Sequence, residues 1–169
     1  MQRQKKKKGN DMRSKRTIEN LGSLNKKALA KLDRFLAIVE SIMTPKGVKV
    51  EVISGLRSWS AQAALYAQGR TKPGKIVTKA RPGSSWHNYG LAIDLGLFKN
   101  GVYLDESKPA EADKLYAEIG RIAEVNGIEW AGHWKSFQET PHFQVTFGMT
   151  LTEARARMEA NGHDIQKLV

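Results

Sequence analysis

Residues 85–94, which read SWHNYGLAID, decide how the rest of the chain is interpreted. A second short segment, residues 139–144, reads ETPHFQ. Each segment carries one of the chain's four histidines close to an acidic residue. Two imidazoles and one carboxylate suit a catalytic zinc ion, which takes three protein ligands and keeps one position open. The two segments therefore predict a metal site made of His87, Asp94 and His142.

The backbone expected around these residues allows them to meet. Leu91 to Leu97 alternates apolar and small or acidic residues, which places Asp94 on one face of a strand. His142 falls on the polar side of a second strand, and Gly90 permits the turn that brings His87 back. Glu139 stands before a Thr-Pro pair that favours extended or turn backbone, so we expect it near the ion as a general base.

A simpler alternative uses no metal. Both histidines would then be half-buried side chains at strand ends, and Asp94 would hydrogen-bond a neighbouring turn. Glu139 would be an ordinary surface carboxylate. The second histidine segment, with an acid three residues before the histidine, favours the metal site.

Length and composition limit the other possibilities. A chain of 169 residues suits one domain with a single core. Cysteine is absent, which excludes disulfides, thiol catalysis and cysteine metal ligands. No apolar run approaches the roughly 20 residues that span a bilayer, and no apolar segment of a secretory signal follows the basic start. We therefore expect neither a membrane span nor export by a signal peptide.

Positive charge is concentrated at the start of the chain. The net charge is +11, and residues 1–16 hold eight basic residues against one acidic residue. We interpret residues 1–16 as a disordered basic tail and residues 17–169 as a single domain. Such a tail attracts polyanions, which include an anionic cell envelope, although a solvated tail without a ligand explains it equally well.

Hydrophobic periodicity predicts four helices, over 24–43, 60–68, 109–126 and 150–162, and three strands, over 48–53, 91–97 and 141–147. Residues 69–85 contain glycine, proline and five basic side chains and are expected to form a long exposed loop. Ser60 is the expected cap of the second helix, and a capping box opens the last helix at Thr150. This order favours an α+β fold, with helices packed on a small, mainly antiparallel sheet that carries the zinc site.

The two motifs resemble those of the LAS-type zinc peptidases, which include D-alanyl-D-alanine peptidases and phage L-alanyl-D-glutamate endopeptidases. Those proteins share Ser-x-His-x-x-Gly-x-Ala-x-Asp, matched here by residues 85–94, and a later acidic residue three positions before a histidine, matched by residues 139–142. Residues 54–58 (SGLRS) are similar to the family's Ser-Gly-Tyr-Arg-Ser. Residues 129–137 (EWAGHWKSF) resemble endolysins, which often have Trp-Gly-Gly-Asp-Trp there.

The resemblance implies a function and a set of roles. His87, Asp94 and His142 would bind one zinc ion, and Glu139 would be the catalytic acid and base. Arg57 would bind substrate or stabilise the oxyanion, with Gln62, Ser85 and His133 as further substrate contacts. The substrate would be the stem peptide of bacterial peptidoglycan, cleaved between L-alanine and D-glutamate.

Several alternatives stay open at this stage. A D-alanyl-D-alanine carboxypeptidase or dipeptidase would keep the same ion with another pocket, and a non-catalytic wall-binding domain would keep the zinc for structure. The resemblance to endolysins implies a monomeric phage or prophage lysin, made in the host cytoplasm and released to act in the periplasm or cell wall. Only the basic tail suggests nucleic acid, and no specific nucleic-acid motif supports it.

Overall fold

The computed structural model describes residues 13–169, which form helices packed on a five-stranded sheet. The strands are β1 (Val48–Ser54), β2 (Ala92–Lys99), β3 (Val102–Tyr103), β4 (Glu129–Trp130) and β5 (His142–Gln144). They follow the order β1-β2-β5-β4, with β3 paired to β2, and every pairing is antiparallel. The expected α+β fold with an antiparallel sheet is confirmed.

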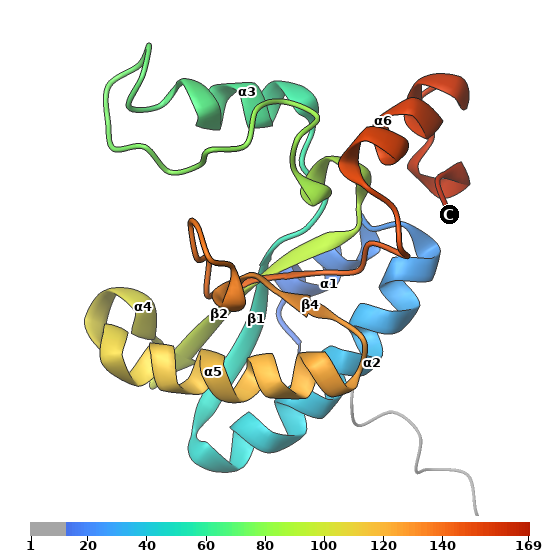
Figure 1. The fold of residues 1–169 in the computed structure, drawn as a ribbon. Coiled ribbons are helices and arrows are strands. Elements are labelled where there is room, and N and C mark those ends of the chain that lie inside the picture. The colour runs from blue at the N-terminus through green and yellow to red at the C-terminus, as the bar shows by residue number, and fades with distance from the viewer. Residues whose placement is uncertain (1–12) are drawn as a thin grey trace, which may run out of the picture.

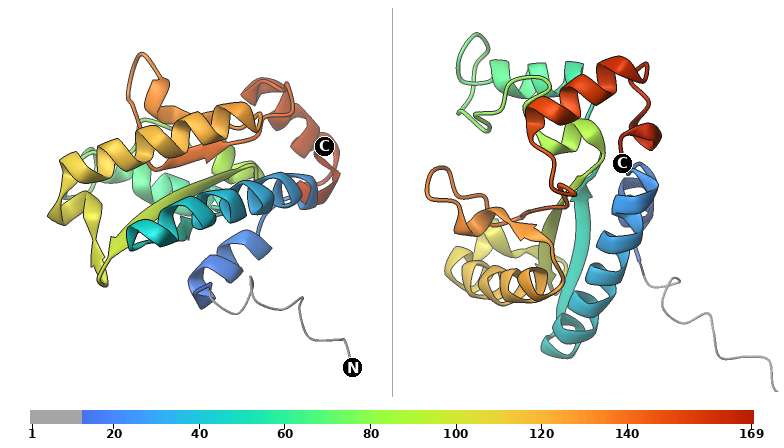
Figure 2. Two further views of the ribbon diagram at one scale, coloured as in Figure 1. Left: turned by 90° about the horizontal axis from the view of Figure 1, so that it is seen from below. Right: turned by 45° about the vertical axis from the view of Figure 1, so that its right-hand side comes forward.

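Six α-helices accompany the sheet in the described residues. They are α1 (Lys15–Gly22), α2 (Lys26–Met43), α3 (Trp59–Ala67), α4 (Leu104–Ser107), α5 (Pro109–Val125) and α6 (Leu151–Ala160). The two long helices, α2 and α5, run alongside the sheet and contact each other, whereas α3, the loop after it and α6 gather at one end (Figures 1 and 2). None of the described helices has both the length and the apolar character needed to cross a bilayer.

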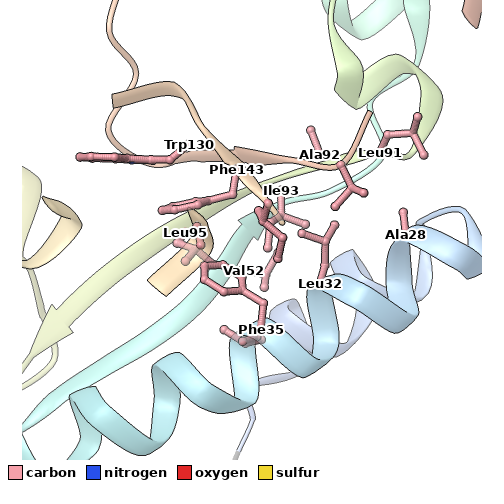
Figure 3. Packing of buried hydrophobic residues seen from close by; sticks show 14 of the residues in the cluster. Ala28, Leu32, Phe35, Val52, Leu91, Ala92, Ile93, Leu95, Trp130 and Phe143 are labelled. Atoms are coloured by element: carbon pink, nitrogen blue, oxygen red, sulfur yellow. The ribbon is translucent and has the colours of Figure 1, made fainter. Parts of the chain in front are cut away.

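The hydrophobic core lies between α2 and the sheet. Figure 3 shows Leu32 and Phe35 of α2 pointing toward the strands, where Ile93 and Leu95 of β2 are fully buried. The Phe35 and Phe143 rings are 5.4 Å apart at their centroids, and Trp130 stacks beyond Phe143. Because side chains alternate along a strand, the residues next to these buried positions in β2 and β5 face the other side of the sheet. Asp94 and His142 are two of them.

The N-terminal segment differs from the expected tail. Residues 1–12 lie outside the described residues, but α1 begins at Lys15, and Arg13 makes ion pairs with Asp33 and Glu40. Part of the segment that charge alone assigned to a tail is therefore helical. The expected attraction of this segment to an anionic envelope stays a prediction.

Several element boundaries also differ from those expected. Ser58, not Ser60, caps α3 by accepting a hydrogen bond from the Ala61 amide. The last strand ends at Gln144, and Phe147 has a left-handed backbone with φ 52°, which a strand does not allow. The capping box at Thr150 is present, as expected.

Candidate metal centre and its cleft

Three separate elements bring His87, Asp94 and His142 together. His87 lies in a 3₁₀ turn, Trp86–Tyr89, which ends at Gly90 with a left-handed φ of 66°. Asp94 of β2 and His142 of β5 are direct antiparallel partners in the sheet. Residues paired in this way have side chains close enough to share a ligand. Sheet register therefore supplies two of the three side chains, and the turn supplies the third.

The three donor atoms that face one another, one from each side chain, form a nearly equilateral triangle. His87 Nε2 lies 3.1 Å from both His142 Nδ1 and Asp94 Oδ1, and His142 Nδ1 lies 3.2 Å from Asp94 Oδ1. Ligand atoms held about 2 Å from zinc at tetrahedral angles are separated by roughly 3.3 Å. Both histidines are buried, whereas a fifth of the Asp94 side chain remains exposed. The triangle therefore has the size and the donor atoms for one zinc ion.

The outer nitrogens of both rings have partners that accept hydrogen bonds. His87 Nδ1 lies 2.8 Å from the Gly55 carbonyl oxygen, and His142 Nε2 lies 2.8 Å from Gln144 Oε1. Because these oxygens can only accept, each outer nitrogen carries a proton, and in the neutral ring each inner nitrogen is left with a lone pair. Two lone pairs and a carboxylate oxygen thus converge. A cation between them removes the repulsion.

Burial and charge act in opposite directions on these groups. Burial alone would raise the pKa of Asp94, but the facing imidazoles of His87 and His142 outweigh it and hold that pKa well below its ordinary value. Without a metal, a proton on the inner nitrogen of His142 can fill the same place: burial lowers the pKa of His142, yet the hydrogen bond and negative charge of Asp94 raise it overall. Asp94 is therefore anionic, as a metal ligand must be.

Glu139 lies beside the cluster without belonging to it. Its Oε2 is 4.0 Å from His142 Nδ1, and a third of its side chain is exposed. The His142 amide donates to the Glu139 carbonyl at 3.1 Å, so a tight turn fixes the spacing of the two side chains. Burial, followed by the charge of Asp94, raises the pKa of Glu139 against the opposing effect of His142. A carboxyl group of this kind suits proton transfer.

Arg57 reaches the same centre from the loop after β1. One guanidinium nitrogen, Nη2, lies 3.5 Å from Asp94 Oδ2 and donates to Ser54 Oγ at 3.0 Å. The other, Nη1, donates to Gln62 Oε1 at 3.0 Å. Gln62 is fully buried and also donates to the Ala80 carbonyl. Gln62 therefore holds Arg57 and the loop over residues 69–85 in place. It does not line the cleft, in contrast to the direct substrate contact that the resemblance implied.

His133 is the other residue that lies elsewhere. Its Nδ1 is 2.6 Å from Glu124 of α5, its ring packs against Trp130, and more than half of its side chain is exposed. It is absent from the described residues that line the cleft. His133 therefore lies outside the cleft lining, and its expected contact with substrate stays a prediction.

A cleft of about 910 Å³ opens over the centre. Arg57, Ser85, Glu139 and all three members of the cluster line it. Residues 77–80, 84 and 85 of the loop after α3 and residues 134 and 136–142 contribute to its lining. Lys79 of the loop lies 4.9 Å from the Phe137 ring. Trp134 and Phe137, from the segment 129–137 that resembles endolysins, also line it, as does Asp105, which the sequence analysis missed.

Comparison with known proteins finds a similarity over the segment that carries this site. Residues 78–145 match the family model described as D-alanyl-D-alanine carboxypeptidase, of the peptidase M15 type. The matched segment contains the whole His87, Asp94 and His142 cluster together with Glu139. This segment is therefore similar to the M15 peptidases. The expected resemblance to zinc metallopeptidases is thereby confirmed.

A known relative shows a similarity over a longer part of the chain. The chain is 44% identical over 106 residues to the peptidoglycan L-alanyl-D-glutamate endopeptidase CwlK of Bacillus subtilis. The match covers 59% of this chain and 62% of CwlK, so the chain spans less than two thirds of that relative.

Solved structures show the fold alone, because their sequences are distant. The L-Ala D-Glu endopeptidase ChiX of Serratia marcescens has a TM-score of 0.50 at 22% identity, covering 82% of this chain and 92% of ChiX. The LD-carboxypeptidase LdcB has a TM-score of 0.53 at 19% identity, covering 86% of this chain and 67% of LdcB. Both share the arrangement of helices on a sheet.

Proposed function

We propose that the protein is a zinc-dependent peptidase that cleaves the stem peptides of bacterial peptidoglycan between L-alanine and D-glutamate. The observation that carries the proposal is the acceptor triangle of His87, Asp94 and His142 at a cleft, with Glu139 close by and outside the triangle. The 44% identity to CwlK favours the L-alanyl-D-glutamate bond.

His87, Asp94 and His142 would hold the ion. Zinc bound there supplies a Lewis acid, which polarises a carbonyl group and lowers the pKa of water. Glu139 takes a proton from the attacking water and later gives it to the leaving amine, so that the amide bond is exchanged for a carboxylate and a free amine. The contact with His142 and the turn at Pro141 keep the Glu139 carboxyl group close to the reacting atoms.

Arg57 would stabilise negative charge in the cleft. Its guanidinium is oriented by Ser54 and Gln62 and stays near Asp94, so little freedom is lost when a substrate binds. A carbonyl oxygen that gains charge during attack, or a substrate carboxylate, is its expected partner. Ser85 lines the same cleft and offers a hydroxyl group to the substrate.

A second candidate is a D-alanyl-D-alanine carboxypeptidase or dipeptidase, which the description of the matched family model favours. It would use the same ion and the same Glu139 with a different fit of the substrate in the cleft. A non-catalytic wall-binding domain is the third candidate, and a base placed beside the cluster argues against it. A role as a phage or prophage endolysin, acting as a monomer on the wall after release, extends the first proposal.

Digestion of purified sacculi distinguishes the three. Zinc-loaded protein is incubated with sacculi, and the released fragments and new amine termini are identified by labelling and mass measurement. New glutamate amine termini are the expected result. Release of free alanine or of an alanine dipeptide would replace the proposal by the second candidate. Binding to sacculi without any new terminus would support the third and overturn a peptidase function.

A further inference from the structure

The two metal-facing histidines are held in different ways. His87 is held by a backbone carbonyl, that of Gly55, which no side-chain substitution removes. His142 is held by the side chain of Gln144, which is buried and lies two residues further along β5. Which nitrogen of the neutral His142 ring carries the proton therefore depends on the orientation of the Gln144 amide.

An amide offers an oxygen at one end and an NH₂ group at the other, so a neighbour that accepts only one of them decides its orientation. Gln144 Nε2 donates to Glu129 Oε2 at 2.8 Å. Because an ionised carboxylate only accepts, the NH₂ end of Gln144 must face Glu129 and the oxygen end must face His142. His142 Nε2 must then carry the proton, which leaves the Nδ1 lone pair facing Asp94 and His87.

Glu129 is itself fixed from two sides. It is the direct cross-strand partner of Gln144 in the pairing of β4 and β5. Its second carboxylate oxygen, Oε1, accepts a hydrogen bond from Thr146 Oγ1 at 2.8 Å. The Glu129 side chain lies outside the cleft lining, so these contacts serve no direct role toward a substrate.

We propose that Glu129 and Gln144 act as a pair of positioning residues that set the tautomer of His142 and thereby the metal affinity of the centre. The proposal rests on the metal site of the proposed function. Partners behind a metal-binding histidine commonly change metal affinity by about 10–100-fold when they are removed. Neither residue belongs to the cluster that would hold the ion, and Glu129 lies outside the cleft lining.

The test measures metal affinity, which is independent of turnover. Zinc and cobalt affinities are determined by competition with a chromophoric chelator, and the visible absorption of bound Co²⁺ reports the ligand geometry. Gln144→Leu removes the acceptor for His142 Nε2 and is expected to weaken binding about 10–100-fold with an altered Co²⁺ spectrum. Glu129→Gln lets the Gln144 amide turn over and is expected to weaken binding to a smaller extent.

A double exchange tests the direction of the hydrogen bonds. In Glu129→Gln/Gln144→Glu, the new carboxylate accepts from His142 and from the new amide, and Thr146 again has an acceptor. Binding and the Co²⁺ spectrum should recover toward wild type, which simple loss of packing does not predict. Glu118→Gln, which alters an ion pair with Lys46 far from the centre, is the matched control and should leave affinity unchanged.

The outcomes separate the two proposals. If the wild type binds neither zinc nor cobalt, the metal site fails and the proposed function fails with it. If the wild type binds metal and the single variants, folded by circular dichroism, bind equally well, only the positioning role is overturned. A double variant that binds metal no more tightly than Gln144→Leu also overturns the positioning role. If Gln144→Leu does not fold, the metal affinity of Glu129→Gln still tests the proposal, because Glu129 is exposed.

Discussion

The surroundings of Asp94 and Glu139 in the cleft shift the pKa values of their carboxyl groups in opposite directions. Asp94 lies between two imidazoles that keep it ionised, whereas burial and the charge of Asp94 raise the pKa of Glu139. When the environments of neighbouring acids push their pKa values apart, the two acids take different roles. Asp94 fits the role of a ligand and Glu139 that of a proton carrier.

Glu139→Gln keeps the size of the side chain and removes its ability to accept a proton. Turnover of isolated stem peptides is expected to fall by about 10²–10⁴-fold, the usual contribution of a general acid–base residue. The zinc content of the purified protein should be unchanged, because Glu139 lies outside the acceptor triangle. Peptide hydrolysis followed by chromatography, with metal analysis of the same sample, measures both.

Glu124→Gln is a matched control for this substitution. It removes the carboxylate paired with His133, outside the cleft, and should leave both turnover and zinc content as in the wild type. Near-wild-type turnover in Glu139→Gln would show that another group moves the proton.

At the level of elements, α1 protects the free edge of the sheet. β1 ends the strand order, so its outer backbone groups lack a neighbouring strand. Thr17 Oγ1 accepts from the Val52 amide at 3.0 Å, and Asn20 Nδ2 donates to the Val52 carbonyl at 2.8 Å. A helix thus supplies the hydrogen bonds that another strand would make, which also blocks edge-to-edge association.

Thr17→Val tests this edge cover. Valine has nearly the same shape but leaves the buried Val52 amide without an acceptor, which costs about 1–3 kcal/mol. The free energy of unfolding, measured by urea denaturation, should fall by that amount. Thr152→Val, an exposed threonine in the first turn of α6, should change it little. Equal effects of the two substitutions would mean that the Thr17 hydroxyl contributes nothing specific.

Across the whole molecule, the metal centre joins parts of the chain that are far apart. Its three residues come from a 3₁₀ turn and two strands, and the outer hydrogen bonds extend to the segment after β1 and to β4. A ligand that binds the folded state alone stabilises it by an amount that grows with the logarithm of its affinity, about 4 kcal/mol when its free concentration is a thousandfold above its dissociation constant.

Removal of the metal should therefore lower the melting temperature. Differential scanning calorimetry of the zinc-loaded protein with and without a strong chelator measures the shift. In His142→Ala, which lacks one ligand, the chelator should have little effect. A wild type whose melting temperature stays the same after metal removal would show that the ion does not bind in the folded core of the molecule.

Local patterns in the sequence were sufficient for much of the fold. The apolar repeat over 24–43, the alternation around Asp94 and the capping box at Thr150 all depend on residues close together in the chain, and the structure has a helix at Lys26–Met43, a strand at Asp94 and the capping box. The short α1 was missed because its few apolar positions follow a highly charged segment. The two motifs also located the candidate site, since their residue types are few and their spacing is short.

Only the tertiary structure decided how those residues act together. His142 meets His87 across 55 positions of sequence and Asp94 across 48, through a strand register that no local pattern specifies. The same holds for the Glu129–Gln144 pair behind His142 and for the position of His133 beside α5. Sequence determined which side chains are available, because chemistry is a property of single residues. The fold determined which of them face one centre, because that depends on how distant strands pair and how the chain turns between them.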